Sequence, residues 1–412
     1  MNTDGEEIAI GIPDSPVQDL HNGTDYRPGR VILQRFFRDK TAAAALLFVA
    51  LLCFLALFAP LIVNGKPLLV YLGGHLSSPA FTALFAPDSQ ELFVEKTFNY
   101  LMLLLPLLGF LALLFQKRKH RNVFRTLAAV SAVLLLVPFL LRGGKMDKTP
   151  WRQIAEQCKG NEFVLFAPVP YGPFETSAKP YMKPDAEHLF GTDHAGRDVF
   201  ARMVYGSRVS LAVGFLATGI SMLLGTAIGL FSGYLGGRVD LFVQRVVEIV
   251  ICFPFFLLLL ILMSIMLDYG SRQSILLVIL VLGLTGWPGL CRLVRGETLK
   301  QRQMAYIQSC EALGVPLHRI LLRHLLPNVS GPIFVSFAFD VAGAILAENS
   351  LSFLGFGVQD PTASWGELLR QAFPDPLTYW HLMLWPGLAI FLTVSAFNFI
   401  AEGLRKAIDL KT

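Results

Sequence analysis

The feature that most constrains this chain is an apolar run from Thr41 to Val63 that contains no charged residue. A helix needs about 20 apolar residues to cross about 30 Å of hydrocarbon, and this run is long enough. The apolar core of a cleaved signal peptide has only about 7–15 residues and is followed by a small-x-small cleavage site. This run is longer and ends in Ala59-Pro60-Leu61-Ile62-Val63. We therefore predict an uncleaved first membrane helix.

Seven further apolar runs follow the first one. They are 100–116, 126–141, 209–231, 246–267, 274–290, 332–347 and 382–400. The composition agrees with many membrane helices: 54% of residues are hydrophobic and 16% are charged, against about 45–50% and about 25% in soluble domains. We predict an all-α polytopic membrane protein with about eight helices. Runs 100–116 and 126–141 are short and flank a basic turn, so they form either a transmembrane hairpin or two half-inserted interfacial helices.

The distribution of positive charge orients the helices. If the N-terminus lies inside, most of the 35 Lys and Arg residues fall in cytoplasmic segments, as the positive-inside rule requires. Both termini are then cytoplasmic. The net charge of +5 reflects this asymmetry, and no basic stripe with interleaved aromatic residues indicates a nucleic-acid partner.

These patterns divide the chain into five parts. They are a cytoplasmic tail (1–40), the first helix with an external loop and the extra hairpin (41–141), an external segment (142–207), a membrane core (208–402) and a cytoplasmic C-terminus (403–412). The external segment is polar and rich in proline, which indicates little regular structure. It contains Asp193, His194 and Asp198, whose spacing fits no standard metal site, so no metal is expected.

The segment 300–330 between two core helices is the most informative one. Gly314 supplies a helix C-cap and Pro327 a helix boundary. The sequence therefore predicts a helix that ends at Gly314, a turn, and an amphipathic helix that ends before Pro327. Two short helices at right angles would form a rigid knob, which suits docking to a soluble partner.

The knob also carries a family resemblance. Gly314, His324 and the following Leu325-Leu326-Pro327-Asn328 resemble the coupling loop of ABC-importer permeases. Four more blocks are similar to permeases of the dipeptide and oligopeptide C-subunit type, in family order. They are 190–211, 233–240, 348–366 and 403–409. Residues 64–70 and 166–172 are similar to the branch that imports oligopeptides and the peptide antibiotic microcin C, in which they share one external loop.

The resemblance implies a type I ABC-importer transmembrane bundle in the bacterial inner membrane. Its implied partners are a second permease subunit, cytoplasmic ATPase subunits, a periplasmic solute-binding protein, a peptide substrate and membrane lipid. No phosphate-binding loop or catalytic motif occurs in the sequence, so we expect no enzyme activity and no cofactor.

The residues expected to couple to an ATPase come from the knob. They are Gln308, Ser309, Cys310, Gly314, His324, Leu326 and Pro327. The family usually has Glu-Ala-Ala beginning six residues before its glycine, where this chain has Gln308-Ser309-Cys310. Because Gln308 is uncharged, we expect docking without a salt bridge at that position.

Two carboxylates are candidates for the translocation path. Asp340 lies inside a predicted span, where a carboxylate is costly and marks either a path or a polar pairing. Glu348 lies in an external block and either faces the path or serves in packing. Asp340 also leaves open a secondary transporter that uses it as a coupling carboxylate. A permease of the same family for nickel or another small solute is also compatible with the sequence, and so is a membrane scaffold or sensor.

Four glycines recur every four residues: Gly225, Gly229, Gly233 and Gly237. Such spacing in a membrane helix permits close approach of another helix. The face packs either against a second permease subunit or within this chain.

Overall fold

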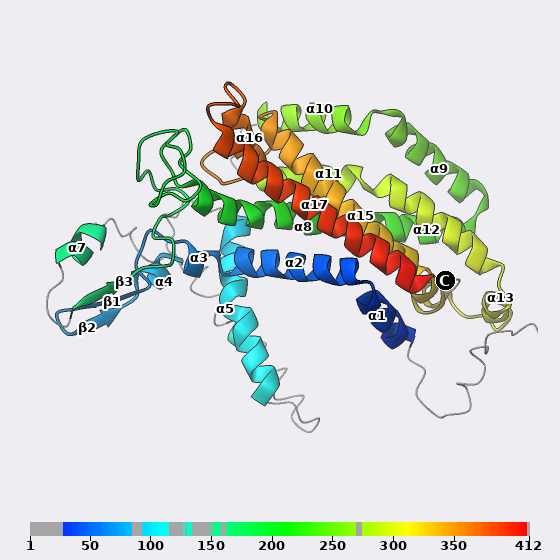
Figure 1. Ribbon diagram of the computed structural model, residues 1–412. Coiled ribbons are helices and arrows are strands. Elements are labelled where there is room, and N and C mark those ends of the chain that lie inside the picture. Colours follow the sequence, from blue (N-terminus) through cyan, green and yellow to red (C-terminus); the bar gives the residue numbers. More distant parts are fainter. Residues whose placement is uncertain are drawn as a thin grey trace, which may run out of the picture.

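The computed structural model describes residues 28–84, 93–114, 127, 130–133, 149, 151–157, 162–268 and 274–409 (Figure 1). The longer helices, of 12 residues or more, are α2 (Lys40–Leu57), α5 (Phe93–Leu114), α8 (Val199–Leu235), α9 (Gly237–Cys252), α10 (Phe255–Asp268), α11 (Ser274–Thr285), α12 (Trp287–Arg302), α15 (Leu326–Phe353) and α17 (Trp380–Ile408). The shorter ones are α1 (Pro28–Arg38), α3 (Ala59–Ile62), α4 (Pro79–Leu84), α7 (Trp151–Gln157), α13 (Ala305–Ala312), α14 (Leu317–Arg319) and α16 (Trp365–Ala372). Within the described residues, six helices are long and apolar enough to cross a membrane, and the bent pair α9–α10 could form a seventh span. The predicted class, a polytopic helical membrane protein, is confirmed.

Helix α8 is the central element of the bundle. It packs against α2, α11, α12 and α15, while α17 crosses both α2 and α15. The core between α8, α10 and α11 consists of buried aliphatic side chains, among them Val213, Leu259 and Val278. The helix begins at Val199, not at the start of its apolar run at 209, because the Asp198 side chain accepts a hydrogen bond from the Ala201 N–H (2.7 Å) and caps the first turn.

The span predicted as one helix over 246–267 is broken. Helices α9 and α10 meet at an angle of 83°, and Phe253 between them is extended (φ −81°, ψ 133°). Pro254 explains the break, because proline lacks an N–H and disfavours helical geometry in the residue before it.

The stretches after the first helix and after the hairpin region, both predicted to be external, share a small sheet, although the composition of 142–207 predicted little regular structure. Strand β1 (Leu69–Leu72) lies between β2 (His75–Ser77) and β3 (Phe163–Leu165), and both pairings are antiparallel. Val70 lies opposite both Ser77 and Val164. The sheet therefore joins the stretch after the first helix to the stretch after the hairpin, although the hairpin separates them in sequence.

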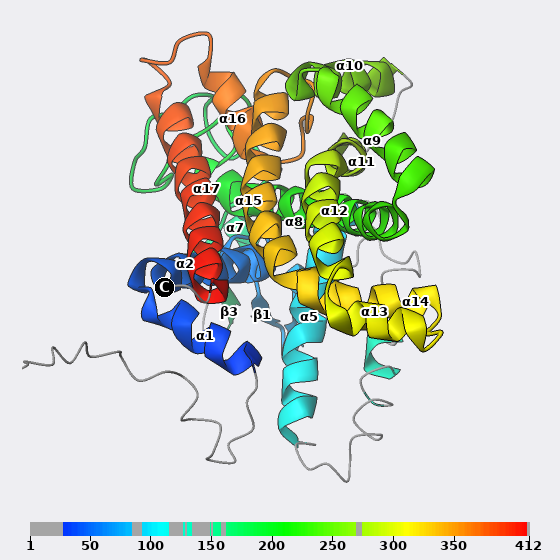
Figure 2. The ribbon, with the colours of Figure 1, turned by 90° about the vertical axis from the view of Figure 1, so that its right-hand side faces the viewer.

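Helix α5 corresponds to the first half of the predicted hairpin. It is apolar enough to span a membrane, but it runs crosswise to α8 instead of alongside it (Figures 1 and 2). The second half, 126–141, lies largely outside the described residues, as do the basic turn 117–125 and residues 1–27.

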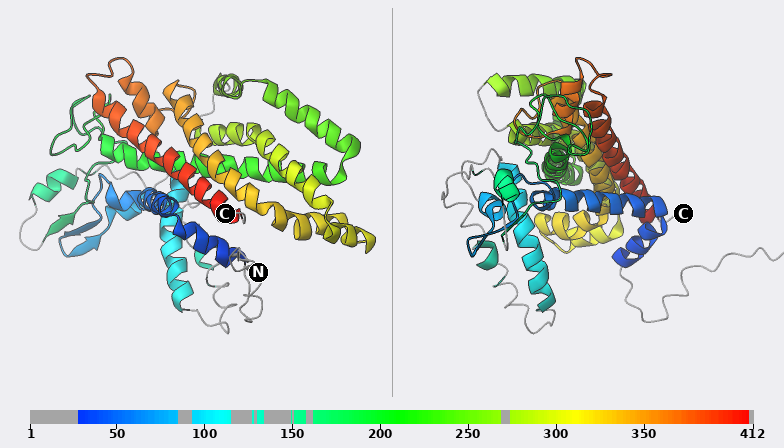
Figure 3. Two further views of the ribbon diagram at one scale, coloured as in Figure 1. Left: turned by 45° about the vertical axis from the view of Figure 1, so that its right-hand side comes forward. Right: turned by 60° about the vertical axis from the view of Figure 1, so that its left-hand side comes forward.

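The elements divide between two ends of the bundle. Helix α1 packs against the C-terminal part of α17, where the Lys406 ammonium pairs with Asp39 (3.2 Å). Helix α13 lies at this same end, beyond the C-terminus of α17 (Figures 1 and 3). The sheet and α16 lie at the opposite end (Figure 1).

Candidate functional site: a membrane cavity, a protruding knob and an external polar network

A cavity of about 690 Å³ lies among α8, the α9–α10 bend, α11, α12 and α15. Its volume is in the range of about 300–1,000 Å³ that is usual for ligand sites. Most of its lining is apolar and includes the phenylalanines Phe253, Phe255, Phe256 and Phe339. The break at Pro254 creates part of this wall, because it turns α9 and α10 around the cavity instead of across it.

The polar groups on the cavity are one carboxylate and several hydroxyls. The carboxylate is Asp340, which accepts a hydrogen bond from the Ser336 hydroxyl (3.1 Å). Thr218, Ser221 and Thr285 contribute hydroxyls from the facing helices. Asp340 is about 20 Å from either end of α15 at 1.5 Å per residue, so it lies near the middle of the span.

Glu348, the second pathway candidate, does not line this cavity. Its side chain is fully buried, and it accepts hydrogen bonds from the hydroxyls of Ser352 (2.9 Å), Ser364 (2.9 Å) and Ser210 (3.3 Å). These serines come from α15, the segment before α16, and α8. Of the two roles considered for Glu348, this geometry favours packing.

Three of the four glycines pack within this chain. A Cβ atom on Gly225, Gly229 or Gly233 would lie 2.9 Å, 2.7 Å or 2.9 Å from backbone carbonyl oxygens of α12. Helix α12 of the same chain thus covers this face of α8. The alternative, that the face packs against a second permease subunit, does not hold for these three glycines. Gly237 lies apart, at the start of α9 with φ +56° and open space around it.

The knob comprises α13, the turn at Gly314, α14 and a π-helical turn over Ile320–Leu325. Its inner side is buried against α8 and α12, with Ile307 and Leu325 at 0% exposure and Ile320 at 2%. The Tyr234 hydroxyl on α8 donates a hydrogen bond to Glu311 (2.8 Å). The knob is therefore packed onto the bundle as a rigid extension.

The prediction that the second knob helix ends before Pro327 is wrong. The helix continues through the π-helical turn into α15, so Leu317–Phe353 is one long helical segment. The Leu326 N–H donates to the Leu321 carbonyl, five residues back. Pro327 occupies the first turn of α15, where its missing N–H and fixed φ are tolerated.

The expected coupling residues lie on or beside the outer surface of the knob. Gln308 is exposed and its amide reaches the Gln303 carbonyl (3.4 Å), while the Ser309 hydroxyl donates to the Ala305 carbonyl (2.9 Å). Gly314 has φ +66°, a conformation that favours glycine. The positions of the other four are as follows: Cys310, His324 and Leu326 are half-buried, and Pro327 is exposed.

Sequence reasoning missed two apolar residues on the knob. Leu313 is 82% exposed and Leu322 is 63% exposed. Amphipathic spacing could not identify Leu313, because it lies in the turn after α13. Exposed leucines on a projecting element favour a protein contact.

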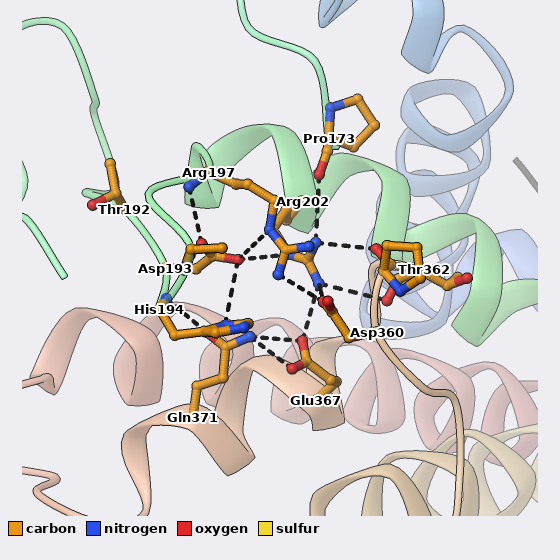
Figure 4. A network of polar contacts seen from close by, with 12 residues as sticks. Pro173, Thr192, Asp193, His194, Arg197, Arg202, Asp360, Thr362, Glu367 and Gln371 are labelled. Atoms are coloured by element: carbon orange, nitrogen blue, oxygen red, sulfur yellow. Dashed lines mark hydrogen bonds and ion pairs between the residues drawn. The ribbon is translucent and has the colours of Figure 1, made fainter. Parts of the chain in front are cut away.

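The end of the bundle that carries α16 contains a buried polar network (Figure 4). Asp193 accepts hydrogen bonds from the Arg197 backbone N–H (2.9 Å) and from its Nε (2.8 Å). Arg197 also donates to Asp360 (2.6 Å), which follows α15 in the chain. These residues form a tight turn held by side chains.

Arg202 connects the same turn to α16. Its guanidinium, which is fully buried, pairs with Glu367 (3.0 Å) and lies 3.3 Å from Asp193. Gln371 donates to both Glu367 oxygens (2.7 and 2.8 Å) and accepts from the His194 backbone N–H (3.1 Å). Figure 4 shows these groups converging from α8, α16 and the loop before each of them.

Asp198, the other carboxylate that the sequence analysis considered beside Asp193, pairs with the buried His188 (2.8 Å). Burial raises the pKa of Asp198, although the hydrogen bonds from Ala201 and His188 act in the opposite direction. Burial also acts to raise the pKa of Asp360, but the hydrogen bond and charge of Arg197 hold it below its usual value. Within the described residues, no group of three His, Cys, Asp or Glu side chains is arranged to hold a metal ion.

Arg208 anchors the crosswise helix α5. Its guanidinium is fully buried and donates to Asn99 on α5 (2.8 Å) and to the Ala56 carbonyl at the end of α2 (2.7 Å). It also lies over the rings of Tyr205 (4.9 Å) and Phe98 (5.5 Å). The Arg208 side chain, which belongs to α8, thereby connects α5 to both α2 and α8.

Comparisons with known proteins agree with this architecture. Residues 225–412 match the family model of the binding-protein-dependent transport system inner membrane component. Residues 27–74 match the N-terminal transmembrane domain of oligopeptide transport permease C. The two ranges flank residues 75–224, which contain the hairpin.

Similar curated proteins indicate more closely which kind of transport permease this chain resembles. The oligopeptide transport system permease protein OppC of Haemophilus influenzae is 36% identical over 294 residues, 71% of this chain and 87% of the relative. The dipeptide permease DppC of Bacillus subtilis is 38% identical over 60% of this chain and 78% of the relative. The glutathione permease GsiD of Pectobacterium atrosepticum is 39% identical over 55% and 74%.

The fold and these matches define a multi-pass inner-membrane component of a binding-protein-dependent transport system. More particularly, the chain belongs to the family of C-type permeases of peptide and oligopeptide ABC importers. This membership favours the importer over the secondary transporter and the scaffold considered from the sequence.

Proposed function

We propose that the chain is one of two membrane subunits of an ATP-driven peptide importer. A periplasmic binding protein delivers peptide at the end that carries the sheet and α16, and ATPase subunits dock at the knob. Peptide is the proposed substrate because the relatives are named for oligopeptide, dipeptide and glutathione transport. Transport of nickel or another small solute is the alternative within the same family.

One observation carries this proposal: the segment Leu317–Phe353 contains both the second half of the knob (α14 and the π-helical turn) and the Asp340 side of the cavity. A displacement of the knob is therefore passed along a single helical segment to the cavity wall. Helix α12 adds a second connection, because it packs on the knob core and also lines the cavity. Alternating access requires such a two-state movement of helices, driven by a partner that binds the two states differently.

The arrangement of the ends supports a cytoplasmic location for both termini. Helix α1, the C-terminal part of α17 and the knob lie at one end of the bundle (Figure 3). Arg35, Arg38, Arg319, Arg323 and Arg405 are at this end. Such clustering of arginine is typical of the cytoplasmic side.

Docking at the knob is tested by Leu313→Asp. A carboxylate at this exposed position cannot be buried against a partner without a large desolvation cost. We expect ATPase co-purification and peptide uptake to be lost while the permease still inserts. Leu377→Asp is the matched control, because Leu377 is 90% exposed in the loop before α17. Full ATPase retention by L313D would refute docking at this surface.

The cavity is tested as a path by Gly343→Phe. Gly343 lines the cavity and has no neighbouring atom within 4 Å of its would-be Cβ. A phenyl ring there fills the cavity without a clash at Cβ, so uptake should fall to background while ATPase co-purification persists. Gly387→Phe on α17 is the control, since Gly387 is equally open and lies outside the cavity. Normal uptake by G343F would exclude the cavity from the path.

A further inference from the structure

We propose that the cavity binds a primary ammonium group of the transported peptide through the Asp340 carboxylate. This inference rests on the proposed function and deepens it, because it assigns a chemical preference to the permease itself. The binding protein is then not the sole source of selectivity. The relevant cation is the α-ammonium of the peptide or the side-chain ammonium of a lysine within it.

The charge of the cavity lining carries the proposal. Asp340 is the one charged residue among the described residues that line the cavity. It accepts a hydrogen bond from Ser336 (3.1 Å), and the described part of the chain places no cationic side chain within 4.0 Å of it. A carboxylate near the middle of a membrane is costly unless it is paired. A cationic ligand supplies the missing partner through a short charge-assisted hydrogen bond.

A second observation points to a polar ligand in the same cavity. Thr218 is one of the residues that line the cavity, it is only 2% exposed, and its hydroxyl oxygen has no hydrogen-bond partner among the described residues. Buried hydroxyls are almost always hydrogen-bonded, so an orphan one indicates a missing partner. A peptide amide or carbonyl provides one. Asp340 and Thr218 come from α15 and α8, so a bound peptide would contact both of these helices.

Because the rest of the cavity lining is apolar, the ammonium is the group of the peptide that the cavity recognises by charge. The four phenylalanines and the aliphatic residues accept peptide side chains of many shapes without directional bonds. Phenyl faces also attract an ammonium group that lies over them. The cavity is therefore permissive toward side chains and selective for positive charge.

The test is a binding measurement on the purified permease–ATPase complex in detergent, without the binding protein. Three probes are used: trialanine, N-acetyl-trialanine and N-acetyl-alanyl-lysyl-alanine. Asp340→Asn should weaken trialanine binding by about 10-fold or more, the size of one hydrogen bond to a charged group, and should leave N-acetyl-trialanine unchanged. Asp340→Glu should restore most of the trialanine affinity.

The lysyl peptide separates the two sources of the ammonium. If its affinity also falls in D340N, the cavity accepts either source; if only trialanine responds, the α-ammonium is the ligand. Glu248→Gln is the control, because Glu248 is an exposed carboxylate on α9 outside the cavity and should change nothing. The ratio of free to acetylated peptide affinity isolates the charge pairing from any general disturbance.

Three results would overturn the proposal. They are equal losses for free and acetylated trialanine in D340N, no loss for trialanine or for the lysyl peptide, and undetectable binding of both of these peptides by the unaltered complex. A blocked path in Gly343→Phe together with an indifferent D340N would reject this inference while the proposed function stands. Normal uptake by G343F would reject the cavity as the path, and with it both proposals about the cavity.

Discussion

Arg202 offers a quantitative test of how the α16 end of the bundle is held together. Its guanidinium is fully buried, pairs with Glu367 at 3.0 Å and lies 3.3 Å from Asp193. In Arg202→Met, Asp193 keeps Arg197 as a partner at 2.8 Å. Glu367, which is 3% exposed, keeps only the neutral Gln371 amide. One buried carboxylate thus loses its cation.

The expected cost follows from that stranded charge. Removing one partner of a buried ion pair typically costs about 3–5 kcal/mol. We expect R202M to destabilise the detergent-purified complex by this amount, measured as a lower thermal midpoint. The segment before α8 should also become accessible to protease, because Arg202 on α8 donates to the Pro173 carbonyl in that segment (3.4 Å) as well as to the Pro361 carbonyl in the loop after α15 (3.2 Å).

Two further variants decide the cause. Arg202→Met combined with Glu367→Gln removes the stranded charge and should recover most of the lost stability, since neutral replacement of a buried pair is often tolerated. Arg245→Met breaks a surface pair with Glu248 (2.6 Å, side chains 74% and 57% exposed) and should cost only about 0–1 kcal/mol. The reasoning is refuted if R202M is no worse than R245M, or if the double variant is no better than R202M.

Three further predictions concern the pH dependence of stability, the packing of α8 on α12 and the anchoring of α5. The pKa of Asp360 is held below its usual value by Arg197, so the stability that Asp360 contributes is present above its unfolded-state pKa and is lost as the pH falls through the lower folded-state pKa. Asp360→Asn should therefore make the thermal midpoint depend less on pH in the acid range. An unchanged pH dependence would contradict this. Gly229→Leu should prevent α8 from packing on α12, because its Cβ would lie 2.7 Å from an α12 carbonyl oxygen, and the variant should not elute as a folded protein in size-exclusion chromatography. Gly219→Leu, whose Cβ meets open space, should elute normally. Arg208→Met should release α5 from its hydrogen bond at Asn99 (2.8 Å) and speed proteolysis between 93 and 114; an unchanged cleavage rate would argue against the anchor.

The knob shows where local sequence signals succeed and fail. Gly314 predicted a turn, and the turn is there because φ +66° favours glycine. Pro327 suggested the end of a helix, but proline is equally compatible with the first turn of one. The choice between the two depends on whether the preceding residues pack. Ile320 and Leu325 are buried against α8 and α12, and this packing keeps the helix continuous into α15.

The sequence named Asp340 and Glu348 as candidates for the translocation path but could not decide which of them faces it. They are eight residues apart on one helix; Asp340 has apolar neighbours on both sides, whereas Glu348 is followed by Asn349 and Ser350. Only the packing of α8 and the segment before α16 distinguishes them. Ser210 and Ser364 surround Glu348 with hydroxyls, whereas the break at Pro254 leaves open space beside Asp340. In the same way, only the position of α12 shows that Gly229 packs within this chain and not against a second subunit.

By itself, the sequence determined the membrane class, the positions of most spans and the family. These depend on the length of apolar runs, the placement of charge and local motifs, all of which are read along the chain. Only the tertiary structure decided that Arg202 meets Glu367, 165 residues away, that one sheet joins strands on either side of the predicted hairpin, and that Asp340 lines a cavity. Such contacts arise because buried charges and hydroxyls must find partners wherever the packed helices place them, and that placement is a property of the whole bundle.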